Sequence, residues 1–167
     1  MSAIDSRSFR DAMGLYASGI TVVSGRVAGE DIGFTCQSFF SVSLDPLLVA
    51  ICVAKTSTTW PVLRPTGAFV INVLAATQQH LSQDFAREVG AARWRQVDIK
   101  RDAGDLPVIG GALLTITCTL EAEHDAGDHL IVIGRVTALT PADAEALADP
   151  LLYYRGAYRT LASAVGE

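Results

Sequence analysis

A cluster of hydroxyl side chains follows the most apolar run of the chain. The run Leu47–Ala54 is short, unbroken and rich in branched residues, which predicts a strand buried on both faces. It ends at a lysine followed by four hydroxyl residues, the segment 55–59. Thr58 or Thr59 suits a helix N-cap, and Pro61 suits the first helical turn. Because backbone N–H groups at such a helix start attract anions, the segment predicts a phosphate site. An ordinary capped helix after a core strand is the alternative.

A polar and aromatic stretch precedes this run at residues 35–43. Hydroxyls, an amide and backbone groups alternate there with phenylalanines. A planar heteroaromatic ligand needs hydrogen bonds at its ring edges and apolar walls at its faces, so the stretch suits such a ligand. A solvated strand that alternates between its two faces is the alternative.

The remaining reactive residue types give weaker patterns. His124 and His129 flank a turn, but no third ligand stands at metal-binding spacing, so we expect no metal. Cys36 has no nearby base, and no serine lies in a nucleophile elbow, so a nucleophilic triad is not indicated. Arg155 lies between tyrosines near the end of the chain, where it either meets a phosphate or packs beside core aromatics.

Composition limits the class of protein. The 167 residues suffice for one compact domain, and the net charge of −5 without a basic block argues against nucleic acid as a partner. Half of the residues are hydrophobic, yet no run reaches the roughly 20 apolar residues of a membrane span. We therefore expect a buried subunit interface and no membrane partner. The three cysteines are scattered and the first residues lack a signal-peptide pattern, so we expect a cytoplasmic protein.

Short strands at hairpin spacing dominate the rest of the chain. Strands are expected at residues 20–24, 32–35, 68–74, 113–123 and 129–139, with a turn at 125–128. Helices are expected at 8–17, 60–64 and 78–87, with one or two helical turns at 141–148. This order lacks a regular alternation of strand and helix, and it predicts a mainly β fold with helical decoration, an antiparallel barrel. We expect a single domain over residues 1–167, with the barrel core at about 8–161.

Seven segments of the chain together carry a family resemblance. They are FRDAMGLYASGITVVS, GFTCQSFFSVSLDPLLVAICV, KTSTTW, FVINVL, LSQDFA, GDH and LLYYRGAY. Their order and spacing over residues 9–161 resemble the flavin reductase family, the short reductases of two-component flavin monooxygenases. The resemblance implies an FMN-binding split β-barrel that forms a homodimer. It also implies an NAD(P)H:flavin oxidoreductase that moves hydride from NADH or NADPH to FMN or FAD and releases reduced flavin to a separate monooxygenase.

The resemblance also assigns residues by motif. The flavin would contact Thr35, Cys36, Gln37, Ser38, Phe39, Ser41, Val42, Ala54, Lys55, Ser57, Thr58, Phe85 and Ala86. Of these residues, Ala54, Lys55, Ser57 and Thr58 would hold the phosphate. The nicotinamide nucleotide would contact His129, Tyr153, Tyr154, Arg155 and Gly156, where His129 positions the nicotinamide. Cys36 and Gln37 depart from the family pattern of a small residue followed by Asn or Ser, and Arg93-Trp94 replaces a more familiar Arg-Phe.

Two other functions are compatible with these residues. A split-barrel oxidase or oxygenase would retain its flavin and act on an organic substrate. A carrier of flavin or haem would bind its chromophore without turnover. The sequence leaves FMN against FAD open and favours NADH slightly, since no arginine marks a site for a 2′-phosphate.

Overall fold

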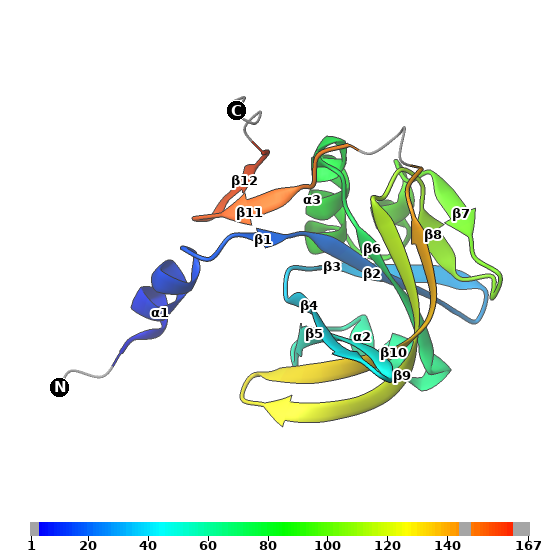
Figure 1. Cartoon of the computed structure of the whole chain (residues 1–167), viewed down its shortest axis with the longest axis horizontal. Helices are drawn as coiled ribbons and strands as arrows, with labels where there is room; N and C mark the ends of the chain where they lie inside the picture. Colours follow the sequence, from blue (N-terminus) through cyan, green and yellow to red (C-terminus); the bar gives the residue numbers. More distant parts are fainter. Residues whose placement is uncertain (1–3, 144–147, 162–167) are drawn as a thin grey trace.

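The computed structural model describes residues 4–143 and 148–161 and is dominated by one curled antiparallel sheet (Figure 1). Its seven strands lie in the order β3-β2-β6-β9-β10-β5-β4. Their bounds are β2 Thr21–Val27, β3 Glu30–Cys36, β4 Phe39–Leu44, β5 Leu47–Ala54, β6 Ala68–Val73, β9 Leu114–Ala126 and β10 His129–Pro141. Every pairing in the sheet is antiparallel. The expected antiparallel barrel with helical decoration is thus confirmed.

Smaller elements surround this sheet. Two small sheets comprise β1 Ser18–Gly19, β11 Leu152–Tyr154 and β12 Ala157–Arg159, and β7 Ile99–Arg101 with β8 Pro107–Ile109. The helical segments are α1 Ser6–Met13, α2 Trp60–Leu63, η1 Arg64–Thr66, η2 Ala76–Gln78, α3 Gln79–Arg87 and η3 Gly90–Trp94. Figure 1 shows α1 extending away from the sheet, and none of its residues is buried. Among the described residues, no helix has the length and apolar character needed to cross a membrane.

Several element predictions change in detail. The first helix is shorter than 8–17 and begins earlier, because Asp5 caps it by accepting from the backbone N–H groups of Arg7 and Ser8. The strands of the β9–β10 hairpin are 13 residues each, so Asp125 and Ala126 belong to β9 and only Gly127 and Asp128 remain as the turn. The strand β10 also continues to Pro141. The rest of the helical turn expected at 141–148 lies partly outside the described residues.

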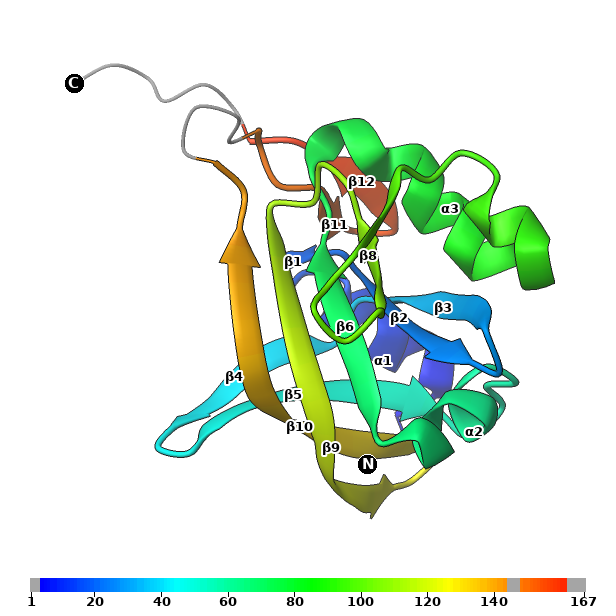
Figure 2. The same ribbon diagram turned by 90° about the vertical axis from the view of Figure 1, so that its right-hand side faces the viewer.

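The two faces of the sheet bury two apolar clusters. Along β2, Val23 faces the barrel interior with Ile51 and Phe69, whereas Val22 packs with Phe85 of α3 in the other cluster. This is the two-residue alternation of a strand with both faces covered. In Figure 2, α3 lies over β2 and β3. The helix therefore has a fixed position against the sheet.

Close packing of α3 requires a glycine on β3. A Cβ atom at Gly33 would lie 2.8 Å from the carbonyl oxygen of Val23 and 2.9 Å from Cε1 of Phe85. Such distances are too short for van der Waals contact, so any larger residue would displace the Phe85 ring. Gly33 thereby sets how closely α3 and the segment after it approach the middle of β3.

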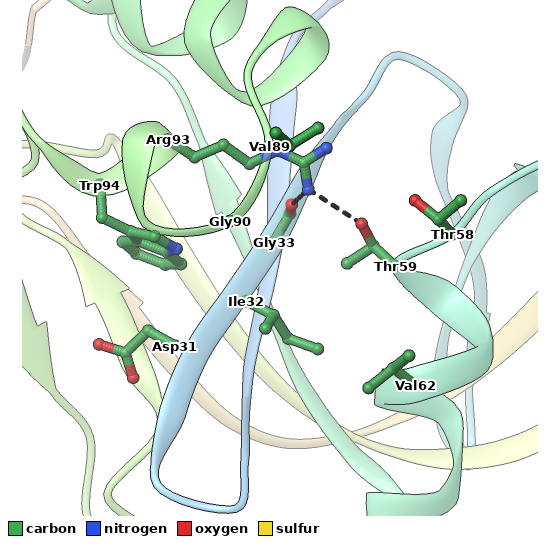
Figure 3. A pocket seen from close by; sticks show the side chains of 10 residues that line it. All are labelled: Asp31, Ile32, Gly33, Thr58, Thr59, Val62, Val89, Gly90, Arg93 and Trp94. Carbon is green, nitrogen blue, oxygen red and sulfur yellow. Dashed lines mark hydrogen bonds between the residues drawn. The ribbon is translucent and has the colours of Figure 1, made fainter.

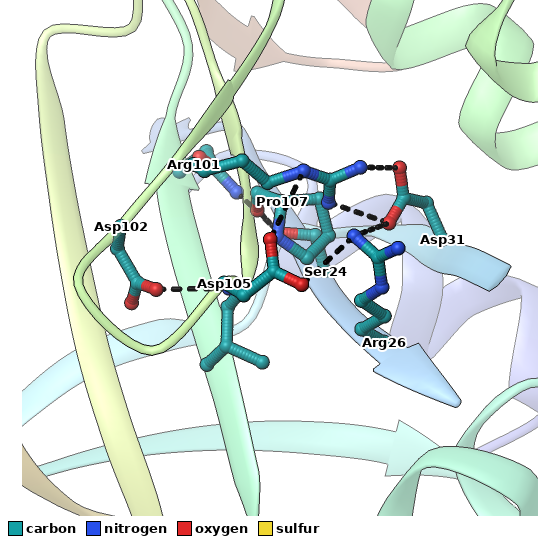
Figure 4. Close-up of polar contacts among 9 residues, drawn as sticks. Ser24, Arg26, Asp31, Arg101, Asp102, Asp105 and Pro107 are labelled. Atoms are coloured by element: carbon teal, nitrogen blue, oxygen red, sulfur yellow. Dashed lines mark hydrogen bonds and ion pairs between the residues drawn. The ribbon is translucent and has the colours of Figure 1, made fainter. Parts of the chain in front are cut away.

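A network of ion pairs joins the β2–β3 hairpin to the β7–β8 hairpin (Figure 4). The guanidinium of Arg101 donates to both carboxylate oxygens of Asp31, at 2.6 and 2.7 Å. Asp105 accepts an ion pair from Arg26 at 3.2 Å, and Ser24 donates to the carbonyl of Pro107 at 2.7 Å. Because every cation in this network has a carboxylate partner, its role is to hold the two hairpins together.

Candidate functional site

The ends of β3 and β5 and the last turn of α3 enclose a cleft of about 600 Å3. It is lined by Phe34, Thr35, Cys36, Gln37, Ser38, Cys52, Val53, Ala54, Thr56, Ser57, Thr58, Thr59, Phe85, Ala86, Arg93 and His129. Nine of the thirteen residues assigned to flavin binding lie in this lining, together with His129. The cleft also explains why β5 is not buried on both faces throughout. Val49, Ala50 and Ile51 are buried, but Cys52 and Ala54 are half-buried because they face the cleft.

The hydroxyl groups at one end of the cleft hold its walls together. Ser38 donates to the carbonyl of Cys52 at 3.0 Å and accepts from the N–H of the same residue at 2.9 Å. Thr35 donates to the carbonyl of Ser82 in α3 at 2.7 Å. These bonds fix the end of β3 between β5 and α3. Donors and acceptors for a ligand at this end are therefore the backbone and the amide of Gln37.

Cys36 is a wall residue and not a nucleophile. It is 5% exposed, and burial raises the pKa of its thiol, so the thiol stays protonated near neutral pH. Cys118, which is fully buried in the barrel interior, behaves in the same way, because burial raises the pKa of its thiol to about 12. All three cysteines are free.

The helix that follows the hydroxyl segment begins where it was predicted. Thr59 is the N-cap residue of α2, but its side chain makes no capping hydrogen bond. The hydroxyl of Ser57 instead accepts a hydrogen bond from the backbone N–H of Trp60, at 3.1 Å. Pro61 lies at the helix start as expected, but α2 has only four residues. A helix this short contributes little macrodipole, so side chains must supply most of the attraction for an anion.

The lysine of this segment is engaged elsewhere. Lys55 follows β5 and Asp125 lies on β9, with β10 between the two strands. The ammonium group of Lys55 forms an ion pair with the carboxylate of Asp125, and this pairing lowers the pKa of Asp125. The Lys55 side chain is not part of the cleft lining. Its assignment to the flavin phosphate stays a prediction, and it requires the side chain to leave Asp125.

Arg93 is the cation that does face the cleft, and our sequence reasoning did not select it as a site residue. Its Nη1 donates to the carbonyl of Gly33 at 2.6 Å and to the hydroxyl of Thr59 at 2.9 Å (Figure 3). Its Nε donates to the carbonyl of Glu88 at 2.5 Å. No carboxylate of the described residues pairs with it. Burial lowers the pKa of this guanidinium. A partly buried cation held only by neutral oxygens attracts an anion.

His129 lines the main cleft from β10, the strand that pairs with β5. It is the first residue of β10 and lies opposite Ala54 of β5 in register. Its Nδ1 is 2.8 Å from a carboxylate oxygen of Asp128, and this hydrogen bond lowers the pKa of Asp128. The bond orients the ring and leaves Nε2 available for a ligand.

A second cleft of about 660 Å3 adjoins the first. Tyr153, Arg155 and Gly156 line it together with α1 and the segment after α1, and Gln37 lines both clefts. Arg155 and Gly156 form a two-residue turn with φ of 51° and 74°, the left-handed conformation of a type I′ hairpin. Three of the residues assigned to the nicotinamide nucleotide thus line the second cleft, which shares Gln37 with the main cleft.

The remaining assigned residues lie outside both clefts. Phe39 packs against the barrel core, whereas Ser41 and Val42 are exposed on the edge strand β4. Tyr154 is half-buried on β11. Their assignments stay predictions, and none is needed to form the main cleft.

Comparison with known proteins places the chain in a family. Residues 13–162 match the family model of the flavin reductase like domain. Over 156 residues, the chain is 38% identical to the flavin-dependent monooxygenase reductase subunit HsaB of Rhodococcus jostii, covering 93% of this chain and 78% of that protein. It is 40% identical over 154 residues to the FMN reductase (NADH) SmoA of Agrobacterium fabrum, covering 92% and 85%. The crystal structure of nitrilotriacetate monooxygenase component B from Mycobacterium thermoresistibile superposes with a TM-score of 0.91 at 36% identity, covering 98% and 90%.

A curled antiparallel sheet with a cleft at its open edge is the architecture of a split barrel. The chain belongs to the flavin reductase like domain family, and the resemblance drawn from its motifs is confirmed.

Proposed function

We propose that this protein is an NAD(P)H-dependent flavin reductase that passes reduced flavin to a separate monooxygenase. The observation that carries the proposal is the main cleft, where apolar side chains such as Phe34, Val53 and Phe85 lie among hydroxyl and backbone groups and the unneutralised Arg93 lies at one end. The apolar side chains suit the faces of the isoalloxazine ring, the polar groups suit its edges, and the guanidinium suits the phosphate. HsaB is named as the reductase subunit of a flavin-dependent monooxygenase and SmoA as an FMN reductase (NADH), and both relatives support this proposal.

The residues of the cleft bind and orient the reactants. Flavin supplies the chemistry, because its ring accepts a hydride from a reduced nicotinamide. Thr35 and Ser38 fix the cleft wall, and Arg93 holds the phosphate end, so the ring has one orientation. His129 then positions the nicotinamide at the open side. Holding two rings in register accounts for up to roughly 7–11 kcal/mol of rate acceleration, so no acid or base is required.

The proposal includes a homodimer, a monooxygenase partner and a cytoplasmic location, with the whole chain as one domain. Support for the dimer comes from apolar side chains on α1, on the segment after it and on β4, because Phe9, Met13, Tyr16, Phe40 and Leu44 are between 48% and 84% exposed. Surfaces of this kind are commonly covered by a subunit. HsaB, named as a reductase subunit, supports the monooxygenase partner, and the three free thiols suit a reducing compartment.

Steady-state oxidation of NADH tests the activity. The purified protein is assayed without flavin and with added FMN, FAD or riboflavin. We expect turnover that saturates with free flavin, because flavin is a substrate. Turnover that needs no added flavin and requires an organic substrate would identify an oxidase or oxygenase, and bound chromophore without turnover would identify a carrier.

Replacing His129 by alanine tests the nicotinamide side. We expect KM for NADH to rise by about tenfold while the Kd for FMN stays within about twofold, because one hydrogen-bonded contact is lost on one reactant only. Fluorescence titration of FMN provides the second value. An equal loss on both reactants would show that His129 maintains the fold of the cleft.

A further inference from the structure

A smaller side pocket adjoins the main cleft at its phosphate end (Figure 3). Its volume is about 200 Å3, and it is lined by the first half of β3, the start of α2 and the segment 89–94. Thr58, Thr59 and Arg93 line both the side pocket and the main cleft. The two spaces therefore meet where the proposed function places the flavin phosphate.

The walls of the side pocket are apolar. Val62 on α2 and Val89 lie on opposite sides of it in Figure 3, and they are 52% and 75% exposed. Trp94 also lines it and packs edge-on against Phe85, with ring centroids 4.8 Å apart and an interplanar angle of 85°. Since Phe85 lines the main cleft, this aromatic pair fixes the two spaces relative to each other.

Arg93 has donors to spare at the boundary. A guanidinium carries five N–H groups, and those of Nε and Nη1 are directed to Glu88, Gly33 and Thr59. Within residues 4–143 and 148–161, Nη2 has no hydrogen-bond partner. Its two N–H groups are therefore free to meet more than one phosphate oxygen.

We propose that the side pocket receives the adenine of FAD, with the pyrophosphate crossing the boundary at Arg93. The inference rests on the proposed binding of flavin in the main cleft. FMN fills the main cleft only, whereas FAD also buries its base between Val62 and Val89. The protein accordingly binds FAD more tightly than FMN.

The size of the pocket fits a base and excludes a second flavin. An apolar cavity of about 150 Å3 holds a benzene ring, so 200 Å3 suits a purine and not a three-ring isoalloxazine. NADH carries the same adenosine diphosphate group as FAD. Binding of flavins without nicotinamide nucleotide distinguishes these two sources.

Two variants that fill the pocket from opposite sides provide the test. Val62→Trp and Val89→Trp place an indole in the pocket from exposed positions, so the core is not overpacked. Ile99→Trp is the matched control, because Ile99 is also a branched residue, is 38% exposed on β7, and lines neither the side pocket nor the main cleft. The Kd values of riboflavin, FMN and FAD are measured by fluorescence titration for each protein, and thermal unfolding verifies that each variant is folded.

We expect the unmodified protein and Ile99→Trp to bind FAD about tenfold more tightly than FMN, which corresponds to one buried base. Either filling variant should remove this advantage and leave the Kd of FMN within about twofold. Equal affinities for FMN and FAD in the unmodified protein, or an FAD advantage that survives both variants, overturn the inference while leaving the flavin site intact. A rise in KM for NADH with unchanged flavin affinities assigns the pocket to the nicotinamide nucleotide and also overturns it. Failure of the unmodified protein to bind any flavin would instead contradict the proposed function.

Discussion

Two arginines of this protein lie in opposite electrostatic settings. Arg101 donates two hydrogen bonds to the carboxylate of Asp31, and this contact raises the pKa of the guanidinium (Figure 4). Among the described residues, Arg93 donates only to two carbonyl groups and one hydroxyl, and burial lowers the pKa of its guanidinium. Figure 3 shows its contacts with Gly33 and Thr59. The first cation is neutralised by the chain. The second is held in place by the chain but not neutralised.

This difference separates structural cations from binding cations. An ion pair completed within the fold contributes to stability and offers nothing to a ligand. A guanidinium held by neutral oxygens has lost part of its hydration without gaining a counter-charge, so an anion binds there with less further desolvation. Replacing each arginine should therefore affect a different property.

The largest expected effect belongs to Arg93. Arg93→Met retains the length of the side chain and removes the charge, so the Kd of FMN should rise by about tenfold to a hundredfold, the range of one charge-assisted contact. Riboflavin, which has no phosphate, should lose at most about threefold. Fluorescence titration of both ligands provides the comparison. Equal losses for the two would mean that Arg93 shapes the cleft and does not bind the phosphate.

Arg101→Met should give the reverse result. We expect a loss of stability of about 1 kcal/mol, or about 2–4 °C in Tm, because Asp31 keeps only its 4.0 Å contact with Arg26. The Kd of FMN should not change. Calorimetry and the same titration check both statements, and weaker FMN binding by this variant would contradict the separation of roles.

A smaller effect is expected at Lys55. This lysine is paired with Asp125 in the structure, so a phosphate must compete with a carboxylate for it. Asp125→Asn should tighten FMN binding by about twofold to threefold and leave riboflavin unchanged, the size of a surface ion pair. If FMN affinity does not change, Lys55 is a surface residue and Arg93 alone supplies the charge.

The smallest effect concerns Arg135, which is neutralised within the chain as Arg101 is. Arg135 donates to both carboxylate oxygens of Glu121 at 2.8 Å, and this pairing lowers the pKa of Glu121. A carboxyl group with a lowered folded-state pKa stabilises the fold above its unfolded-state pKa, and the stabilisation disappears as the pH falls through the folded-state pKa. Glu121→Gln should therefore lower Tm slightly at pH 7 and not at about pH 3. A difference in Tm that is the same at both pH values would assign it to packing.

Local patterns predicted much of the fold. The apolar run of β5 had its observed bounds, Leu47–Ala54, because strand and turn signals coincide there. The turn of the β9–β10 hairpin was expected too long, since the pattern does not show that Asp125 continues the ladder opposite Leu130. The curl of the sheet, which brings the ends of β3 and β5 to one cleft, depends on distant pairings that no local pattern records.

The site was predicted where its motifs are contiguous and missed where it depends on tertiary contacts. Residues 35–38 and 57–58 line the cleft as assigned. Arg93 belongs to the short segment η3 and reaches Gly33 and Thr59 across 60 and 34 positions of sequence. The Arg-aromatic pair at 93–94 was the one available signal. The sequence could not identify Arg93 as a binding residue from this pair, because it does not show that the described part of the folded chain brings no carboxylate to the guanidinium.

The crystal structure of the protein with FMN tests the central claim most directly. We predict that the ring lies in the cleft between residues 35–38 and Phe85, with a phosphate oxygen within hydrogen-bonding distance of the Arg93 guanidinium. A phosphate bound elsewhere, with Arg93 still contacting only Gly33, Thr59 and Glu88, would contradict the claim that this arginine is held ready for an anionic ligand.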